Sequence, residues 1–196
     1  MAEISVEQIK KLKELSGAGL TDAKKALVEA NGDFDKALEA MRKKGLTKAE
    51  KRGDRETREG LVEAYIHDGR LGAIVEVNCE TSFVAKTDEF KTLAHQIAMQ
   101  VASMNPLYVS EDDIPAKVRE AKMKELEENF KGPANMKEQI LSGQVKKAFS
   151  DKVLLNQPYI LDDTKTVEQF IKEAIAKTGE NITIRQFKRI ELGVTE

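Results

Sequence analysis

Across residues 78–90 the spacing of apolar residues changes from that of a strand to that of a helix, and this change constrains the fold more than any other feature. Residues 71–77 are rich in β-branched side chains, which is typical of a strand, and from Asp88 the apolar residues recur at helical spacing. The connector between the two runs carries Phe83 and Val84 among polar residues. Phe83 either packs under the helix or projects toward another molecule, and the connector alone favours the first interpretation.

Further strand signals flank this connector. Residues 61–67 and 71–78 read as strands joined by Asp68-Gly69, a strong hairpin signal, and residues 181–192 read as a third strand. The side chains expected to share a face are Val62, Ala64 and Ile66, then Ala73, Val75 and Val77, and, in a regular last strand, Ile182, Ile184, Ile190 and Leu192. We expect an α+β fold with a three-stranded antiparallel sheet flanked by helices. A partner or a second copy of the chain would cover its exposed face.

Helical segments occupy most of the remaining core region, residues 60–196. Thr87 is expected to cap a long helix that Asn105-Pro106 ends. Residues 111–158 are predicted to form a helical excursion away from the sheet, with a break at Gly143. A last helix, capped by Thr166, precedes the third strand.

The first 46 residues predict a bundle of three short helices. Ser5 and Gln8 have the spacing of a capping box, Asn31-Gly32 ends the second helix, Asp33 caps the third, and Gly45 is the expected stop. The arrangement resembles the ubiquitin-associated (UBA) fold, a small binding module. Such a bundle has too little interior for an active site, so we expect it to present a docking surface.

Composition limits the possible partners and compartment. The 196 residues carry a net charge of −2, and residues 47–59 form a charged linker of mixed sign, so no direct nucleic-acid binding is expected. Cys79 is the only cysteine, which excludes an internal disulfide and suits a reducing cytoplasm. The sequence shows neither a signal peptide nor an apolar run long enough for a membrane span.

The residues do not assemble into a recognisable catalytic or metal-binding motif. His67 lies at a hairpin turn and His95 within a helix, and neither has a partner at metal-ligand spacing. Gly17-Ala18-Gly19 is not a phosphate loop, because no strand precedes it and no lysine ends it. Cys79 beside Glu80 leaves a remote thiol activity as an alternative. We therefore expect that the protein is not an enzyme and that it has neither a cofactor nor a metal site.

Two long motifs and several short ones carry a family resemblance. Residues 12–27 with 29–33, and residues 75–85, resemble the two signatures of the bacterial elongation factor Ts family. Met104-Asn105-Pro106, Gln157-Pro158, Gly179-Glu180-Asn181-Ile182 and Arg185-x-Phe187-x-Arg189 match in the same order. The resemblance covers nearly the whole chain.

The resemblance implies a function and a site. Members of the family are guanine-nucleotide exchange factors that bind the GDP form of elongation factor Tu and promote GDP release. The family's Thr-Asp-Phe-Val motif falls on Thr81, Ser82, Phe83 and Val84, so Ser82 stands where the family has Asp. The aromatic, here Phe83, is implied to act as a wedge that disturbs the Mg²⁺ and nucleotide site of Tu.

The resemblance also implies a docking surface and a homodimer. The N-terminal contacts with Tu fall on Lys13, Leu20 and Thr21, next to the turn Gly17, Ala18 and Gly19. The single core half is like the family's short forms, which pair as dimers. The competing interpretation is a UBA-type adaptor that binds another helical protein, although such an adaptor has no need of the 81–84 motif.

Overall fold

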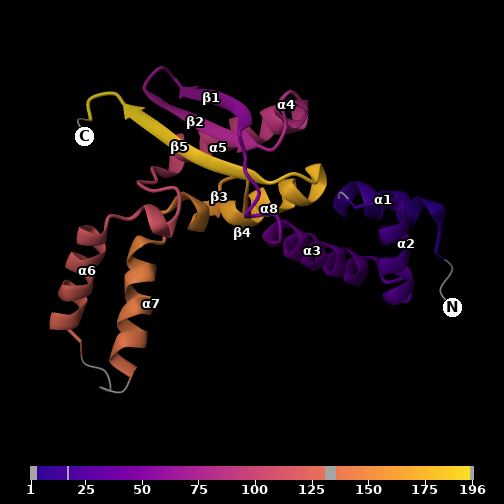
Figure 1. Ribbon diagram of the computed structural model, residues 1–196, viewed down its shortest axis with the longest axis horizontal. Helices are drawn as coiled ribbons and strands as arrows, with labels where there is room; N and C mark the ends of the chain where they lie inside the picture. The colour runs from indigo at the N-terminus through magenta and orange to yellow at the C-terminus, as the bar shows by residue number, and fades with distance from the viewer. Residues whose placement is uncertain (1–3, 17, 131–135, 195–196) are drawn as a thin grey trace. The chain divides into compact units, whose positions relative to one another are not determined.

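The computed structural model describes residues 4–16, 18–130 and 136–194 (Figure 1). Its main elements are α1 Val6–Ser16, α2 Leu20–Glu29, α3 Phe34–Glu50, β1 Glu59–His67, β2 Leu71–Cys79, α4 Ser82–Ala85, α5 Asp88–Met104, α6 Ala116–Glu128, α7 Lys137–Phe149, β3 Pro158–Tyr159, β4 Asp162–Thr166, α8 Val167–Thr178 and β5 Ile182–Glu191. Strands β1, β2 and β5 form an antiparallel sheet in that order, which confirms the predicted α+β class. The separate β3–β4 hairpin has no counterpart in the sequence predictions.

The described chain divides into two compact units. One comprises the residues up to Val62 together with Glu76–Ala94 and Gln169–Ile184, and the other comprises Glu63–Val75, His95–Glu168 and Arg185 onward. Among the described residues, no helix combines the length and apolar character needed to cross a membrane.

In the first unit, α1, α2 and α3 pack around one small apolar cluster. Its buried members are Ile9, Leu12, Ala23, Ala26, Leu27, Ala37 and Met41. Ser5 and Gln8 bond reciprocally, with the Ser5 amide donating to Gln8 Oε1 at 3.0 Å and the Gln8 amide donating to Ser5 Oγ at 3.1 Å. The amide of Lys36 donates to Asp33 Oδ1 at 3.1 Å. Both predicted caps are therefore confirmed.

The prediction that Gly45 ends the third helix is wrong. Helix α3 continues through Gly45 to Glu50, into the segment that the sequence marks as a linker. A Cβ on Gly45 would lie 3.2 Å from Cβ of Ala176 on α8, so the missing side chain allows a close approach between two helices. Tertiary packing offsets the cost of about 0.5–1 kcal/mol that glycine brings to a helix interior.

The β1–β2 hairpin turns as predicted. Asp68 and Gly69 both have positive φ, at 50° and 64°, as the tight turn requires. On β2 the predicted face is buried, with Ala73, Val75 and Val77 almost inaccessible to solvent. On β1 the corresponding apolar set is exposed, and the partly buried side chains are Leu61, Glu63 and Tyr65. An apolar pattern identifies a strand face but does not say whether helices cover it.

Strand β5 does not keep one environment along its length. Ile182 and Ile184 are buried, whereas Ile190 and Leu192 are exposed by 76% and 63%. Arg185 and Gln186, between them, are both exposed, so the alternation of burial is interrupted there. The prediction that these four apolar side chains share one face of a regular strand therefore does not describe their burial.

In the second unit, α6 and α7 form the predicted helical excursion (Figure 1). Ile114, Val145, Phe149 and Val153 make its apolar cluster. The expected break at Gly143 is wrong, because α7 runs through it. A Cβ there would meet nothing within 4 Å, and the packing of neighbouring residues such as Val145 outweighs the preference of glycine against helix.

Two buried amides anchor the base of the excursion. Gln100 Nε2 donates to Gln157 Oε1 at 3.2 Å and to the carbonyl of Pro158 at 3.1 Å. Gln157 Nε2 donates to the carbonyls of Met104 and Asp151. The two glutamines are buried with these polar groups paired. Their bonds join residues before the excursion, Gln100 and Met104, to residues after it, Gln157 and Pro158.

Candidate functional site

The turn that follows β2 is a single-turn helix, α4, with one exposed aromatic side chain. Thr81 is its N-cap, and Thr81 Oγ1 accepts from the amide of Val84 at 3.4 Å. Val84 and Ala85 are buried, whereas Phe83 is 79% exposed. The exposure of Phe83 excludes the interpretation that it packs in the core. Ser82 is also exposed, so the four residues of the predicted motif divide into one anchor, Val84, and three accessible residues.

Thr87 closes the other end of α4 and begins α5. Its hydroxyl donates to the carbonyl of Val84 at 2.8 Å and accepts from the amide of Phe90 at 3.2 Å. The predicted cap on the long helix is therefore confirmed. The same side chain also ties α4 to α5, so the backbone of the turn is held at its C-terminal end.

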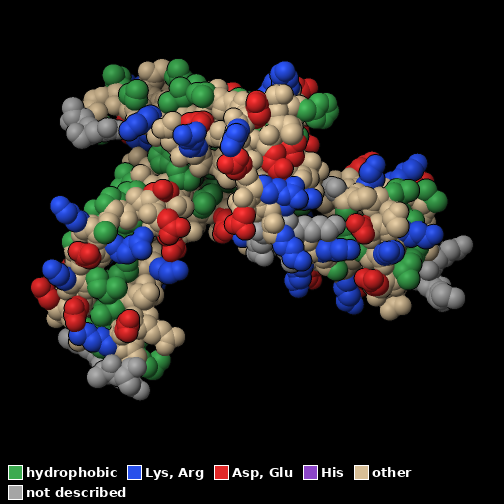
Figure 2. All heavy atoms as spheres, in the orientation of Figure 1, with side chains coloured by type: hydrophobic (Ala, Val, Ile, Leu, Met, Phe, Trp, Pro, Cys, Tyr) green, Lys and Arg blue, Asp and Glu red, His purple; other side chains and the backbone are tan. Residues whose placement is uncertain are grey.

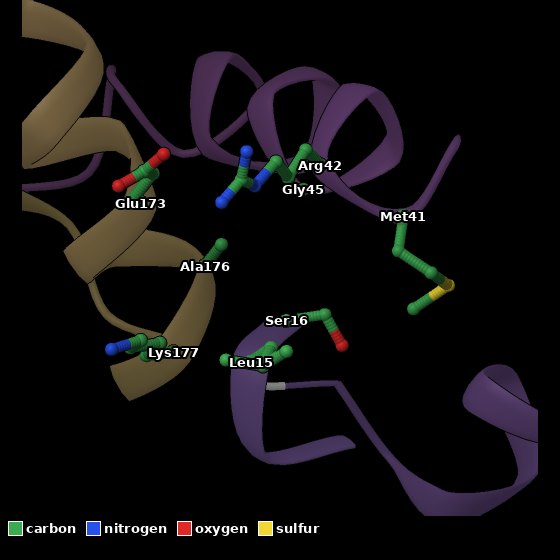
Figure 3. A pocket seen from close by; sticks show the side chains of 8 residues that line it. All are labelled: Leu15, Ser16, Met41, Arg42, Gly45, Glu173, Ala176 and Lys177. Carbon is green, nitrogen blue, oxygen red and sulfur yellow. The ribbon is translucent and has the colours of Figure 1, made fainter. Parts of the chain in front are cut away.

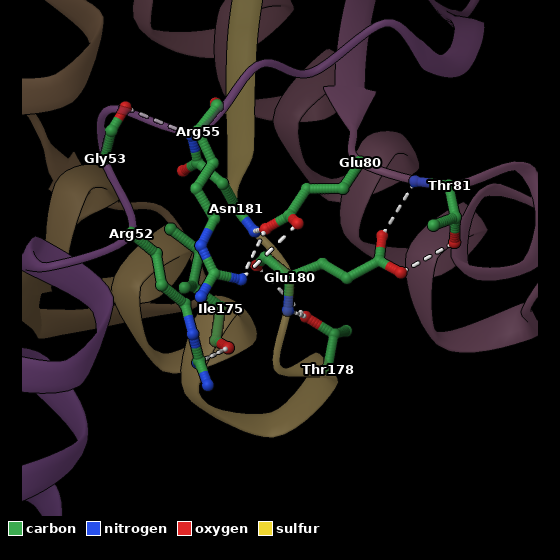
Figure 4. A network of polar contacts seen from close by, with 9 residues as sticks. All are labelled: Arg52, Gly53, Arg55, Glu80, Thr81, Ile175, Thr178, Glu180 and Asn181. Atoms are coloured by element: carbon green, nitrogen blue, oxygen red, sulfur yellow. Dashed lines mark hydrogen bonds and ion pairs between the residues drawn. The ribbon is translucent and has the colours of Figure 1, made fainter.

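Two carboxylates hold the N-terminal end of the turn, where β2 ends and β5 begins (Figure 4). Glu180 Oε2 accepts from the Thr81 amide at 3.0 Å, and Glu180 Oε1 accepts from the Thr81 hydroxyl at 2.6 Å. In return, Glu80 Oε1 accepts from the Asn181 amide at 2.6 Å. Each carboxylate thus binds the residue that follows the other. We call Glu80, Thr81, Glu180 and Asn181 the carboxylate clasp.

Cationic and amide groups complete this arrangement. Arg55 Nη1 lies 3.3 Å and 3.4 Å from the two oxygens of Glu80, and Asn181 Nδ2 donates to the carbonyls of Gly53 and Arg55. The Asn181 amide, and secondarily Arg55, hold the pKa of the Glu80 carboxyl below its ordinary value. Arg52 Nη1 donates to the carbonyl of Ile175 near the end of α8 at 3.3 Å. The segment after α3 is therefore hydrogen-bonded to Glu80, just after β2, and to Asn181, just before β5.

Cys79 is placed as a structural residue. Its side chain is fully buried, and the thiol donates to the carbonyl of Thr81 at 3.2 Å. Burial, followed by the charge of Glu180, raises the pKa of the Cys79 thiol, which disfavours the nucleophilic thiolate. No group of three His, Cys, Asp or Glu side chains that could hold a metal ion occurs among the residues that the structure describes.

The predicted N-terminal docking residues lie around the α1–α2 turn. Lys13, Gly19, Leu20 and Thr21 are exposed, and Ala18 is half-buried. Gly17 lies outside the described residues. Ser16 shapes the turn locally, because its hydroxyl donates to the carbonyl of Leu12 at 2.6 Å and accepts from the Ala18 amide at 3.4 Å.

Leu15 is an exposed apolar residue of this surface that the motif comparison does not select. It lines a hollow of about 80 Å³ together with Ser16, Met41, Arg42, Gly45, Glu173, Ala176 and Lys177 (Figure 3). Pockets for small-molecule ligands have volumes of about 300–1,000 Å³, several times that of this hollow. It is too small for a nucleotide, and the surface around Leu15 and Leu20 is suited to a protein.

The second unit presents a larger apolar surface on the sheet. Ala64, Ile66, Ile74, Ile190 and Leu192 line an open hollow of about 440 Å³, with Arg70 and Lys188 among its other residues. Hydrophobic side chains gather over the β1–β2 hairpin and the end of β5 at the upper left of Figure 2. We call the five apolar residues the open sheet face.

Sequence reasoning selected Thr81 but missed the other three residues of the carboxylate clasp, Glu80, Glu180 and Asn181. Glu180 and Thr81 are 99 residues apart, and Glu80 and Asn181 are 101 apart, so no local pattern joins them. Glu80 and Thr81 fall within the motif of residues 75–85, and Glu180 and Asn181 fall within one of the short motifs, but neither motif shows that the two pairs are in contact.

An exposed aromatic on a braced turn and a helical module with exposed Lys13 and Leu20 are features typical of a protein that docks on another protein. Residues 3–194 match the family model described as Elongation factor TS. The chain is 52% identical to elongation factor Ts of Thermotoga maritima, over 97% of both chains, and 46% identical to that of Fervidobacterium nodosum, over 97% of this chain and 99% of the relative. It is also 51% identical to elongation factor Ts of Rippkaea orientalis, over 98% of this chain and 80% of the relative.

The chain therefore belongs to the elongation factor Ts family, and the resemblance found in its motifs is confirmed. Its role is that of a translation elongation factor.

Proposed function

We propose that this protein is the guanine-nucleotide exchange factor for elongation factor Tu, and that it promotes GDP release by disturbing the Mg²⁺ and nucleotide site of Tu. The exposure of Phe83 on the braced α4 turn is the observation that carries the proposal. Single exposed apolar side chains are common on protein surfaces, but Phe83 has the highest exposed fraction of the large hydrophobic side chains that the structure describes, and its turn is held at both ends. The family of the chain implies Tu as the partner, and we infer that the protein binds the GDP form.

The magnitude of the effect limits what Phe83 does by itself. Burying one Phe side chain contributes roughly 1.5–3 kcal/mol, which corresponds to a loss of nucleotide affinity of about 10- to 150-fold. A larger acceleration of GDP release requires the rest of the interface. Because coupling between two ligands is reciprocal, a factor that weakens GDP binding is itself bound less tightly when GDP is present.

The four residues of the 81–84 motif have different roles in this proposal. Phe83 is the wedge, and Val84 anchors the turn from the inside. Thr81 sets the backbone at the start of α4. Ser82 presents a neutral hydroxyl where the family has a carboxylate, so no charge from this position acts on the Mg²⁺ site of Tu.

The N-terminal module supplies affinity for Tu. We infer that residues 1–46 dock on Tu through Lys13, Leu20, Thr21 and the turn that includes Gly17, Ala18 and Gly19. Residues 47–59 then link this UBA-like module to a core of residues 60–196. Limited proteolysis tests the division, because a linker is cut before the two domains that it joins.

The open sheet face supports a homodimer. Its apolar side chains are exposed and contiguous on one side of the sheet, and a second copy of the chain would cover them. Changing Ile66 to Asp places a charge in the middle of the face, so sedimentation equilibrium would show a monomer. The matched variant Leu161→Asp, at an exposed leucine outside the face, would remain a dimer. A wild-type monomer at micromolar concentration would refute the dimer.

Stopped-flow release of a fluorescent GDP analogue from Tu tests the exchange activity. We expect Phe83→Ala to bind Tu and to slow the maximal release rate by about 10- to 150-fold. Leu161→Ala removes another exposed apolar side chain, on a different part of the chain, and serves as the control. Release at the wild-type rate by Phe83→Ala would exclude the wedge, and failure of the wild-type protein to bind Tu would favour an adaptor for another helical partner. We place the activity in the cytoplasm, with no cofactor of its own.

A further inference from the structure

Every polar atom of Thr81 takes part in a hydrogen bond. Its amide and its hydroxyl both donate to Glu180, its Oγ1 accepts from the Val84 amide, and its carbonyl accepts from the Ala85 amide at 3.2 Å and from the Cys79 thiol. A threonine hydroxyl has one proton to donate and two lone pairs to accept with. Because Glu180 takes the proton, a lone pair is directed to the cap of α4.

The exposed Phe83 cannot set its own position. Its side chain has little contact with its own chain, so its direction depends on the backbone of α4. A helix of four residues is not stable by itself, because nucleation costs more than one turn of hydrogen bonds returns. The conformation of α4 therefore depends on the burial of Val84 and on the groups that hold its ends, which are Glu180 at the start and Thr87 at the finish.

We propose that Glu180 is a positioning residue that fixes Thr81 and thereby preorganises Phe83 for insertion into the partner. The inference rests on the proposed function for the role of Phe83 but not for the geometry of the turn. Glu180 does not touch the partner in this proposal. It acts through Thr81. Without Glu180 the turn would populate other conformations, and binding would have to offset the cost of ordering it.

The variant Glu180→Gln removes the charge and one of the two acceptor oxygens with little change in shape. A glutamine side chain has one acceptor oxygen, and its NH₂ group would face one of the two donors of Thr81. We expect the maximal GDP-release rate at saturating factor to fall about tenfold, as the loss of one charge-assisted hydrogen bond implies. Glu89→Gln is the matched control. It makes the same charge change on α5, where the carboxylate has an exposed ion pair with Lys177 at 3.7 Å.

A double-mutant cycle tests whether Glu180 acts through Phe83. In a Phe83→Ala background, Glu180→Gln should slow release no further, because there is no wedge to position. Equal rates for Glu180→Gln and Glu89→Gln would overturn the proposal. So would an additive loss in the double mutant, because it would show that Glu180 acts by another route.

Amide hydrogen exchange in the free protein tests the positioning without Tu. We expect the Thr81 and Val84 amides to exchange at least tenfold faster in Glu180→Gln than in the wild type, and at the wild-type rate in Glu89→Gln. Unchanged exchange at Thr81 would overturn the inference. If Phe83→Ala releases GDP at the wild-type rate, the proposed function fails, and the positioning of the turn is decided by this measurement.

The Thr81 side of the contact keeps the proposal testable if Glu180→Gln folds poorly. Thr81→Val retains the shape of the side chain and removes its hydroxyl, so it should slow release and speed exchange at Val84. Thr81→Ser restores the hydroxyl and should recover most of both effects relative to Thr81→Val. Equal behaviour of the serine and valine variants would overturn the inference.

Discussion

The two turns of the candidate interface are built in different ways. The α1–α2 turn is closed by bonds between near neighbours, such as those that the Ser16 hydroxyl makes with Leu12 and Ala18. The turn after β2 is held by Glu180, which is 99 residues from Thr81 in the chain. One turn depends on its own sequence, and the other depends on the sheet that brings the ends of β2 and β5 together.

This difference has a consequence for how each surface responds to change. A locally closed turn keeps its shape as long as its helices form, so its affinity for a partner is set by the exposed side chains. A turn held by distant carboxylates loses its shape whenever the sheet is disturbed. We therefore expect the docking surface to be robust and the wedge to be sensitive to substitutions in the core.

Gly60→Ala is expected to have the largest effect on stability and to disturb the turn after β2 without disturbing the α1–α2 turn. Gly60 has φ of 149°, and a Cβ there would lie 2.2 Å from the carbonyl oxygen of Val77, close to the end of β2. The clash is with backbone, so the strands must separate. We expect a loss of about 4 kcal/mol in the free energy of unfolding, combining backbone strain with broken ladder bonds. Urea unfolding followed by circular dichroism measures it.

Gly69→Ala is the control for backbone strain alone. Gly69 also has positive φ, at 64°, but a Cβ there would meet nothing within 4 Å, so we expect about 1 kcal/mol. Hydrogen exchange in Gly60→Ala should show Thr81 unprotected while amides in α1–α3 keep their protection. Equal loss of protection in both regions would contradict the separation of the two turns.

Lowering the pH should weaken the clasp and leave the α1–α2 turn unchanged. The Asn181 amide holds the pKa of Glu80 below its ordinary value of 4.5, so this carboxylate binds fewer protons in the folded state than in the unfolded state. Its contribution is therefore fully present above about pH 4.5 and is lost as the pH falls through the lower, folded pKa. Glu80→Gln should lower the free energy of unfolding by about 1 kcal/mol at pH 7. This is less than a fully buried bond to a charged group contributes, because solvent screens the partly exposed Glu80 carboxylate.

The pH profile of the difference between wild type and Glu80→Gln is the measurement. Urea midpoints at pH 7, 5 and 3 should show the difference shrink only below about pH 4.5. Glu120→Gln on α6 is a suitable control, because its carboxylate has no hydrogen bond or ion pair with any residue in the described ranges. A difference that stays constant down to pH 3 would show that the Glu80 carboxylate does not hold the clasp.

Sequence reasoning succeeded wherever the determining contact is local. The bonds of Ser5 with Gln8, the Asp68-Gly69 turn and the Thr87 cap each involve residues within four positions of one another. It failed at Gly45 and Gly143, where packing of helix neighbours overrides a local preference against helix. The clasp could not be predicted, because the pairing of Glu180 with Thr81 exists only once β2 and β5 lie together in the sheet.

The smallest expected effect comes from removing a local cap. Ser5→Ala deletes the oxygen that accepts from the Gln8 amide at the start of α1, where water can replace the lost bond. We expect a loss of about 0.5 kcal/mol, at the low end for an exposed N-cap, confined to the three-helix module. Thr87→Ala removes a cap that also ties α4 to α5, so it should cost about 1 kcal/mol or more and speed exchange at Val84. If Ser5→Ala altered exchange at Val84 as much as Thr87→Ala does, the three-helix module and the α4 turn would unfold as one cooperative unit. The distinction between a locally closed turn and a turn held by distant residues would then be wrong.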